Sequence, residues 1–249
     1  MNSLTLVTES HPGPLDVAIS HSILSAVSDG ELGATLRLHV PGAILAFGRA
    51  DRVTPGYAAA VRVARAHGFA AIERLAGGRA AVFHEKTLAF SLALPLAEPK
   101  TGIHERFETV SDIMVEAFSS IGVDARVGEV PGEYCPGQWS VNVGGKVKVM
   151  GVGQRLVRGA AHVGGVVVVD DGHRIRDVLI PVYRALGLDW DPRTAGSLAD
   201  RSPGITNQLV SKAIEKRFAA RYDLTPAAIP DDILERAASL VDEHLPRVA

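Results

Sequence analysis

The sequence has little of several features that would mark particular classes of protein. Its 249 residues include one cysteine, so an internal disulfide and a closed thiolate metal cage are both excluded. The 26 Lys and Arg nearly balance the 28 Asp and Glu, and the formal net charge of −2 gives no overall field that would attract nucleic acid or a membrane surface. No apolar run approaches the roughly 18 residues needed to span a bilayer, and residues 1–4 lack the basic start of a secretory signal. We therefore expect a cytoplasmic globular protein whose partners include neither nucleic acid nor membrane.

The rest of the composition is that of an ordinary folded domain. Hydrophobic residues make up 47% of the chain and charged residues 22%, which is enough apolar content for a full core. We find no low-complexity block, fixed-period repeat or flexible linker. The sequence therefore predicts one domain over residues 1–249, in which approximately residues 171–249 form a helical C-terminal part packed on the rest.

Hydrophobic periodicity predicts strands through most of the chain and helices at its end. In residues 35–40, Leu36 and Leu38 alternate with Arg37 and His39, which predicts a half-buried strand. Short hairpin-like links favour an α+β fold over repeating parallel βαβ units. We expect helices at residues 15–28, 54–67, 107–121, 175–186, 206–221 and 231–244, and strands at 4–7, 35–40, 43–47, 70–75, 80–83, 87–94, 140–143, 146–149 and 163–169.

The first segment of chemical interest is residues 74–85, where Gly77 and Gly78 lie between two predicted strands. Paired glycines allow a positive φ and a close approach of the backbone to a ligand. Arg79 adds a planar set of donors that suits a phosphate or carboxylate group. The local pattern alone favours a plain hairpin with an exposed arginine.

The lone cysteine, Cys135, lies in the second such segment, residues 132–140. An isolated cysteine is most often a small buried hydrophobe. Here Pro136 and Gly137 follow directly and favour a turn, where a thiol can be presented to a ligand. Such a thiol becomes a nucleophile when a nearby cation favours the thiolate.

The third segment, residues 144–155, contains Lys146 and Lys148, which share one face of a predicted strand. A solvated face is the simplest interpretation of two lysines at this spacing. The chain uses arginine far more than lysine, however, so two lysines between glycine pairs also suggest a specific role.

Familiar nucleotide and metal motifs are missing from the same region. Val147 follows Lys146 where a P-loop needs Ser or Thr. Gly151 and Gly153 lack the third glycine of a dinucleotide-binding fingerprint. The nine histidines do not show the spacing of a closed zinc site. We therefore expect no metal ligands in this chain.

Taken together, the three segments resemble the biotin/lipoate ligase and octanoyltransferase superfamily, and most closely its single-domain, cysteine-dependent octanoyltransferases. The similarity follows the order and spacing of the family over nearly the whole chain. It is carried by residues 15–19, 35–37, 47–49, 77–85 and 148–155, and by an apolar strand that ends at Asp170.

The resemblance implies a mixed, largely antiparallel sheet flanked by helices, of the class II synthetase and biotin-ligase type, with an apolar tunnel for a medium-chain acyl group. It implies that Cys135 is the catalytic nucleophile and that Lys148 contacts the acyl carbonyl, where a cation also lowers the thiol pKa. It assigns acyl or adenylate binding to Arg74, Gly77, Gly78, Arg79, His84 and Gly151.

Three functions remain open on these residues. The first is transfer of an octanoyl or lipoyl group from an acyl carrier protein thioester, through Cys135, to a lysine of a lipoyl domain or of glycine-cleavage H protein, with no cofactor required. The second is an ATP- and Mg-dependent lipoate–protein ligase that acts through lipoyl-adenylate. The third is a non-catalytic binder of an acyl group or adenylate. Arg79 stands where the ligases usually have a third glycine, which favours the first function over the second.

Overall fold

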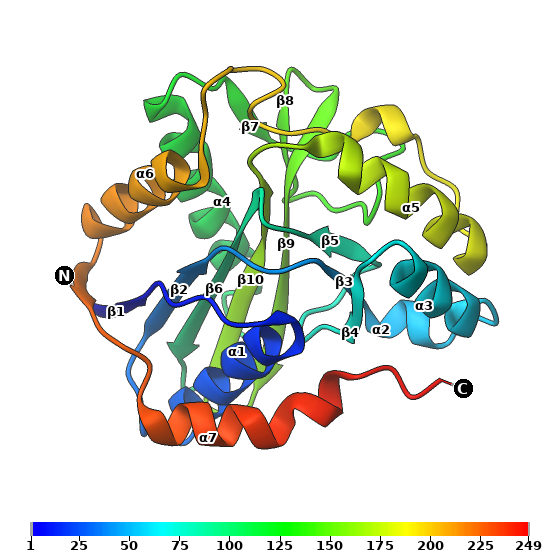
Figure 1. The fold of residues 1–249 in the computed structure, drawn as a ribbon. Helices are drawn as coiled ribbons and strands as arrows, with labels where there is room; N and C mark the ends of the chain where they lie inside the picture. The colour runs from blue at the N-terminus through cyan, green and yellow to red at the C-terminus, as the bar shows by residue number, and fades with distance from the viewer. Residues whose placement is uncertain (1, 249) are drawn as a thin grey trace.

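An open eight-stranded sheet forms the centre of the structure, a computed structural model that describes residues 2–248 (Figure 1). Its strand order is β11-β1-β2-β6-β10-β9-β8-β7, and a second sheet of three strands has the order β4-β3-β5. The strands are β1 (Ser3–Val7), β2 (Thr35–His39), β3 (Ile44–Phe47), β4 (Ala70–Glu73), β5 (Ala81–Phe83), β6 (Thr87–Pro95), β7 (Ala125–Val127), β8 (Val141–Val143), β9 (Val147–Val157), β10 (Ala160–Val168) and β11 (Asp223–Pro226). The helices are α1 (Gly13–Ser28), α2 (Arg49–Arg52), α3 (Tyr57–Ala66), α4 (Ile103–Ser120), α5 (Gly172–Leu186), α6 (Asn207–Ala219) and α7 (Asp231–Leu240), with short 3-10 turns η1 (Pro192–Thr194) and η2 (Val241–His244).

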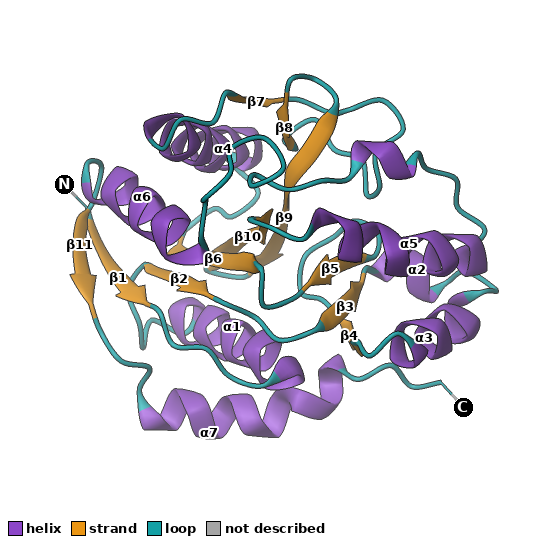
Figure 2. Ribbon diagram, turned by 45° about the horizontal axis from the view of Figure 1, so that its top comes forward, coloured by secondary structure: helices purple, strands orange, loops and turns teal. Residues whose placement is uncertain are grey.

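Most neighbouring strands of the large sheet are antiparallel. The long strands β6, β10 and β9 form its centre, where Gly165 of β10 lies opposite Phe90 of β6 and Val152 of β9. At the other end, β1 pairs in parallel with both β2 and β11. Helices lie on both faces of this sheet (Figure 2). The prediction of an α+β fold with a mixed, largely antiparallel sheet flanked by helices is therefore confirmed.

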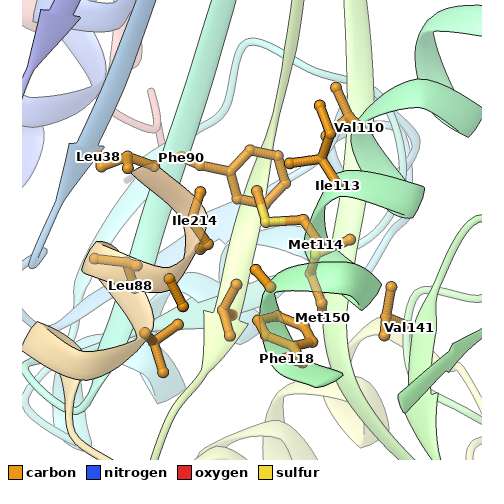
Figure 3. Close-up of a cluster of buried hydrophobic side chains, with 14 of the residues drawn as sticks. Leu38, Leu88, Phe90, Val110, Ile113, Met114, Phe118, Val141, Met150 and Ile214 are labelled. Carbon is orange, nitrogen blue, oxygen red and sulfur yellow. The ribbon is translucent and has the colours of Figure 1, made fainter. Parts of the chain in front are cut away.

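The helices divide into groups that cover different faces. Helices α1 and α7 pack together on one face of the large sheet and α4 and α6 on the other, while α3 and α5 cover the small sheet (Figures 1 and 2). Figure 3 shows the core beneath α4, where Ile113, Met114 and Phe118 meet Phe90 of β6 and Met150 of β9. Each fully buried side chain of this kind contributes about 1.5–3 kcal/mol. No helix within residues 2–248 is both long enough and apolar enough to cross a membrane.

Strand β2 is buried on both faces, which corrects the prediction of a half-buried strand. Arg37 is 0% exposed and His39 is 7% exposed, because α1 covers the face that carries them. The Arg37 guanidinium donates hydrogen bonds to the Asp16 carboxylate on α1 and to the carbonyl oxygens of Asp16 and Glu9. A buried charge is tolerated when it is paired and hydrogen-bonded in this way. Alternating polarity therefore reflected an interior ion pair rather than contact with solvent.

The C-terminal part contains one strand among its helices. β11 extends the edge of the large sheet, with Ser3 of β1 opposite Asp223. Its four residues, Asp-Leu-Thr-Pro, have no alternating apolar pattern, so periodicity did not predict them. The three-residue strand β7 was missed for the same reason. The helices predicted in this part, at residues 175–186, 206–221 and 231–244, correspond to α5, α6 and α7 with η2.

Candidate active site

Cys135 lies in the loop between β7 and β8 in a backbone conformation that is rare for its residue type. Its φ is +44°, in the left-handed region that few residues other than glycine adopt. Hydrogen bonds hold it there: its N–H donates to the Tyr183 hydroxyl at 2.9 Å, and its carbonyl accepts from Lys148 Nζ at 2.7 Å. The Tyr183 hydroxyl in turn donates to the carbonyl of Ala80 at 3.0 Å. Strain of this kind, typically about 1–3 kcal/mol, persists where the surroundings fix the residue, and it concentrates at functional sites.

The Cys135 thiol is half-buried and surrounded by donors. Its Sγ accepts the backbone N–H of Arg79 at 3.1 Å and the Arg74 Nη2 at 3.3 Å. Burial raises the pKa of the Cys135 thiol, but the charges of Arg74 and Lys148 and the two hydrogen bonds outweigh it, so the pKa is lowered from its ordinary value. The thiol is thus held in a setting that favours the thiolate, the form in which cysteine acts as a nucleophile.

Lys148 and Glu133 form a buried ion pair beneath this loop. Lys148 is 1% exposed and Glu133 is 3% exposed, so the prediction of a solvated lysine face is wrong for Lys148. It holds only for Lys146, which is exposed and precedes β9. Lys148 Nζ donates to Glu133 Oε1 at 2.9 Å and to the carbonyls of Tyr134 and Cys135 at 3.0 and 2.7 Å. The lysine therefore fixes the backbone on which the thiol sits.

Glu133 is a residue of the site that sequence reasoning missed. Its Oε1 also accepts from the Ser140 hydroxyl at 2.5 Å, and its Oε2 accepts from the N–H of Val130 at 2.9 Å. The three acceptors of Lys148 lie in residues 133–135, the segment that ends at the cysteine. An acidic residue two positions before a lone cysteine was the available signal, but without the fold nothing paired it with a lysine on another strand.

Two cavities meet beside Arg74. The outer cavity is bordered by Gly77, Gly78, Cys135, Trp139, Lys148 and Gly151 among others, and it holds about 1080 Å³ of space, open solvent included. The inner cavity is bordered mainly by apolar side chains, among them Val17, Ile44, Ile72, Leu75 and Phe90, and it holds about 610 Å³ by the same measure. Arg74, Phe83 and Gly165 border both. Clefts lined mainly by apolar side chains with a few polar groups are typical of small-molecule sites.

Gly78 and Gly165 lie where any side chain would collide with residues around the two cavities. Gly78 has a φ of +102°, and a Cβ there would lie 2.2 Å from Arg74 Nη2 and 2.9 Å from Cys135 Sγ. A Cβ on Gly165 would lie 1.9 Å from the carbonyl oxygen of Gly151 and 2.9 Å from the Phe90 ring. The prediction of a positive φ is therefore confirmed at Gly78, where the backbone lies close to Arg74 and Cys135. Gly77 has no positive φ, and a Cβ there would meet nothing within 4 Å.

The other residues singled out in the sequence are not all at the cavities. Gly151 borders the outer cavity, and a Cβ there would lie 3.5 Å from Lys148 Cε. Arg79 offers its backbone N–H to the thiol, but its side chain turns away to the carbonyl of Ala50 at 2.9 Å and the carboxylate of Asp51 at 3.4 Å. His84 is buried in the turn after β5, accepts the N–H of Lys86 at 3.2 Å, and borders neither cavity.

The rim of the outer cavity carries two aromatic rings that sequence reasoning also missed. Phe107 of α4 stacks on Trp139 with ring centroids 6.1 Å apart and planes 7° from parallel, and both side chains border the cavity. His104, on the same helix, lies against Trp139 as well. In the part of the chain that the structure describes, no group of three or more His, Cys, Asp or Glu side chains is placed to hold a metal ion.

The fold is that of the lipoate-protein ligases. A crystal structure of lipoate-protein ligase A bound with ATP superposes with a TM-score of 0.77 at 17% identity, covering 97% of this chain and 94% of that one. A bi-partite lipoate protein ligase from Thermoplasma acidophilum superposes with a TM-score of 0.74 at 18% identity. The superposition covers 98% of this chain and 93% of that one.

The family follows from the sequence. Residues 14–219 match the lipoyl protein ligase A/B catalytic domain, and the chain belongs to this family. An octanoyl-[GcvH]:protein N-octanoyltransferase of Geobacillus kaustophilus is 31% identical over 187 residues, which cover 73% of this chain and 66% of that protein. A lipoyl-[GcvH]:protein N-lipoyltransferase of Listeria monocytogenes is 25% identical over 177 residues, which cover 67% and 63%. The chain thus spans less than two thirds of the length of each of these relatives.

Proposed function

We propose that this protein transfers an octanoyl group, or the related lipoyl group, to a lysine of a partner protein through a thioester on Cys135. The observation that carries this proposal is the placement of the thiol in the outer cavity, within 3.3 Å of an arginine that also borders the apolar inner cavity. A nucleophile at the mouth of an apolar space suits an acyl substrate. The names of the curated relatives support the same chemistry.

The proposed reaction consists of two successive acyl transfers. The Cys135 thiolate attacks the donor thioester carbonyl, the new C–Sγ bond forms, and the donor thiolate leaves and takes a proton from solvent. The neutral lysine amine of the acceptor then attacks the same carbonyl carbon, the C–N bond forms, the C–Sγ bond breaks, and the amine releases one proton. Splitting the reaction in this way replaces one difficult step by two easier ones. No ATP or metal ion is needed on this route.

The inner cavity would supply binding energy for the acyl chain. Each methylene removed from water contributes about 0.8 kcal/mol, so seven chain carbons could provide roughly 5–6 kcal/mol. A chain seated between Ile44, Ile72 and Phe90 would place its carbonyl near Arg74, at the junction with the outer cavity. The outer cavity would remain for the acceptor lysine.

The relatives' names indicate glycine-cleavage H protein as a partner, since each name contains GcvH. We propose the thioester of acyl carrier protein as the donor, and a lysine of glycine-cleavage H protein or of a lipoyl domain as the acceptor. Octanoylated H protein serves as a second donor to be tested, with a lipoyl domain as its acceptor. An amide donor would leave less acyl-enzyme at equilibrium, because an amide is more stable than a thioester.

The test is intact-mass analysis after mixing with each octanoylated donor. The chain has one cysteine, so any thiol-linked octanoyl group belongs to Cys135. We expect a mass increase of one octanoyl group that hydroxylamine removes and that Cys135→Ala and Cys135→Ser both lack. Full transfer to the acceptor by Cys135→Ala would rule out the covalent route.

The same assay separates the two alternatives. Formation of lipoyl-adenylate from free lipoate and ATP would instead support a ligase. Tight binding of octanoate with no transfer from any donor would support a non-catalytic binder.

A further inference from the structure

Polar side chains border one side of the otherwise apolar inner cavity. His39 of β2, Ser91 of β6 and His162 of β10 come from one face of three neighbouring strands. Asp16 of α1, the helix that covers this face, borders the same space. A cavity for a plain hydrocarbon chain gains nothing from these groups, because polar atoms buried against carbon cost free energy unless they are hydrogen-bonded. The hydrogen bonds of each group therefore show whether it has a use for a polar ligand atom.

His39 is the group whose nitrogen lacks a partner. Ser91 Oγ and His162 Nδ1 lie 3.1 Å apart and satisfy each other. Asp16 Oδ1 accepts from the Arg37 guanidinium, and the remaining Oδ2 is a further acceptor. His39 is 7% exposed, and its Nδ1 is buried with no hydrogen-bond partner within residues 2–248. Because buried polar atoms nearly always have a partner, this exception points to an atom supplied by a ligand.

The surroundings of the ring show that His39 Nδ1 is a donor. A guanidinium can only donate, so His39 Nε2, which lies 3.5 Å from Arg37 Nη1, is the acceptor of that contact. The Asp16 carboxylate is 3.7 Å from the same nitrogen, too far for a hydrogen bond. Burial and the charge of Arg37 lower the pKa of His39, so the ring is neutral and carries one proton. That proton is therefore on Nδ1, beside the cavity.

His39 lies at the end of the inner cavity that is far from the thiol. Of the large sheet, the outer cavity touches β9 and β10, and the inner cavity touches β10, β6 and β2. Gly165, where the cavities meet, lies opposite Phe90, which lies opposite Leu38, the neighbour of His39. Strands are about 4.8 Å apart, so His39 is roughly 10 Å from this junction. An acyl group with its carbonyl at the junction would bring its distal carbons to His39.

We infer that His39 selects the far end of the acyl chain, and that its N–H favours an end that bears sulfur, as in the dithiolane ring of a lipoyl group, over the plain end of an octanoyl group. The inference rests on the proposed function and narrows its substrate. A carbon end displaces water from the N–H and offers no acceptor in return, whereas sulfur is a polarisable, weak acceptor. The Asp16 Oδ2 acceptor has nothing to offer a disulfide, so the His39 donor makes the distinction.

A matched set of ligands isolates this one contact. Lipoate is compared with 5-cyclopentylpentanoate, which keeps the ring but has a methylene in place of each sulfur, and with octanoate. Binding of each to the intact protein is measured by calorimetry. His39→Phe and His39→Leu remove the donor, whereas His39→Asn keeps an N–H near the position of Nδ1. His67→Phe changes an exposed histidine that borders neither cavity and is the control.

The ratio of the two ring ligands is the decisive quantity. A buried donor left unmet lowers affinity roughly five- to hundredfold, and sulfur is a weak acceptor, so we expect the wild type to bind lipoate about five- to tenfold more tightly than the carbocycle. The ratio should fall to about one in His39→Phe and His39→Leu, and should stay near the wild-type value in His39→Asn and His67→Phe. Either of the first two variants suffices if the other does not fold. A wild-type ratio near one, or a ratio that survives loss of the donor, would overturn the inference.

Loading of the thiol separates this inference from the proposed function. The wild type is mixed with equal amounts of lipoyl and octanoyl acyl carrier protein, and the two acyl-enzymes are counted by intact mass. We expect more lipoyl-enzyme than octanoyl-enzyme in the wild type and the reverse shift in His39→Phe. If the ligands bind with the expected ratio but no acyl-enzyme forms, the proposed function fails and the role of His39 stands. If octanoyl-enzyme forms in excess and the variant leaves the proportion unchanged, the proposed function stands and the role of His39 is wrong.

Discussion

Removing the Lys148 ammonium should destabilise the whole protein through the charge it leaves behind. In Lys148→Met, Glu133 remains 3% exposed, with hydrogen bonds from Ser140 and Val130 but no opposite charge. Breaking a buried ion pair from one side typically costs about 3–5 kcal/mol. The two remaining hydrogen bonds to the carboxylate place the expected loss at the lower end, about 3 kcal/mol of unfolding free energy.

The double variant and a neighbouring lysine give the matched comparisons. Lys148→Met with Glu133→Gln removes both charges and should recover at least half of the loss, since replacing a whole buried pair is often nearly neutral. Lys146→Met changes an exposed lysine two residues away and should stay within about 0.5 kcal/mol of the wild type.

Urea unfolding followed by circular dichroism measures these differences. If the single variant is as stable as Lys146→Met, or if the double variant is as unstable as the single one, the buried pair does not hold the loop as described.

Three further predictions follow from the cavities and the buried histidine. Gly78→Ala should lower the unfolding free energy by roughly 1–3 kcal/mol, because alanine is strained at the positive φ of this position. The new side chain should also displace Arg74 and so shift the alkylation of Cys135 to higher pH. Gly77→Ala introduces no such strain and should keep the wild-type urea midpoint. Ala46→Leu narrows the inner cavity, so assays with acyl donors of different length should show a preference for shorter acyl groups. Each excluded carbon should weaken binding about fourfold. An unchanged preference would mean that the acyl chain binds elsewhere. Burial lowers the pKa of His162 from 6.5 to about 4, so the unfolded state binds more protons between these values and stability should fall as the pH drops through this range. His162→Gln should reduce this decrease in unfolding free energy by up to roughly 3 kcal/mol. An identical pH profile in the variant would show that other groups cause the decrease.

The sequence predicted most of the fold because long periodic segments carry strong signals. The α1 and α4 helices and the β6 and β10 strands lie within a few residues of their predicted positions. Strand β2 was misjudged because Arg37 finds its partner in Asp16, 21 residues away, and such a pairing leaves no local pattern. The short strands β7 and β11 exist only because a neighbouring edge is there to pair with.

The site was only partly predictable for a related reason. Cys135 and Gly78 were found because a lone thiol before a turn and paired glycines between strands are visible in one stretch of sequence. Arg79 was singled out for the donors of its side chain, but in the structure its backbone N–H contacts the thiol and its side chain turns away. Glu133, Tyr183 and the stacked pair Phe107 and Trp139 depend on the packing of distant segments, which residue spacing does not encode.

The most direct measurement is a chase of isolated acyl-enzyme. The protein is loaded with radiolabelled octanoate from acyl carrier protein, freed of donor by gel filtration, and mixed with a lipoyl domain or H protein. Label should pass from Cys135 to one acceptor lysine as fast as the overall reaction turns over. Label that remains on the sulfur while steady-state transfer proceeds would show that the thioester lies off the reaction path.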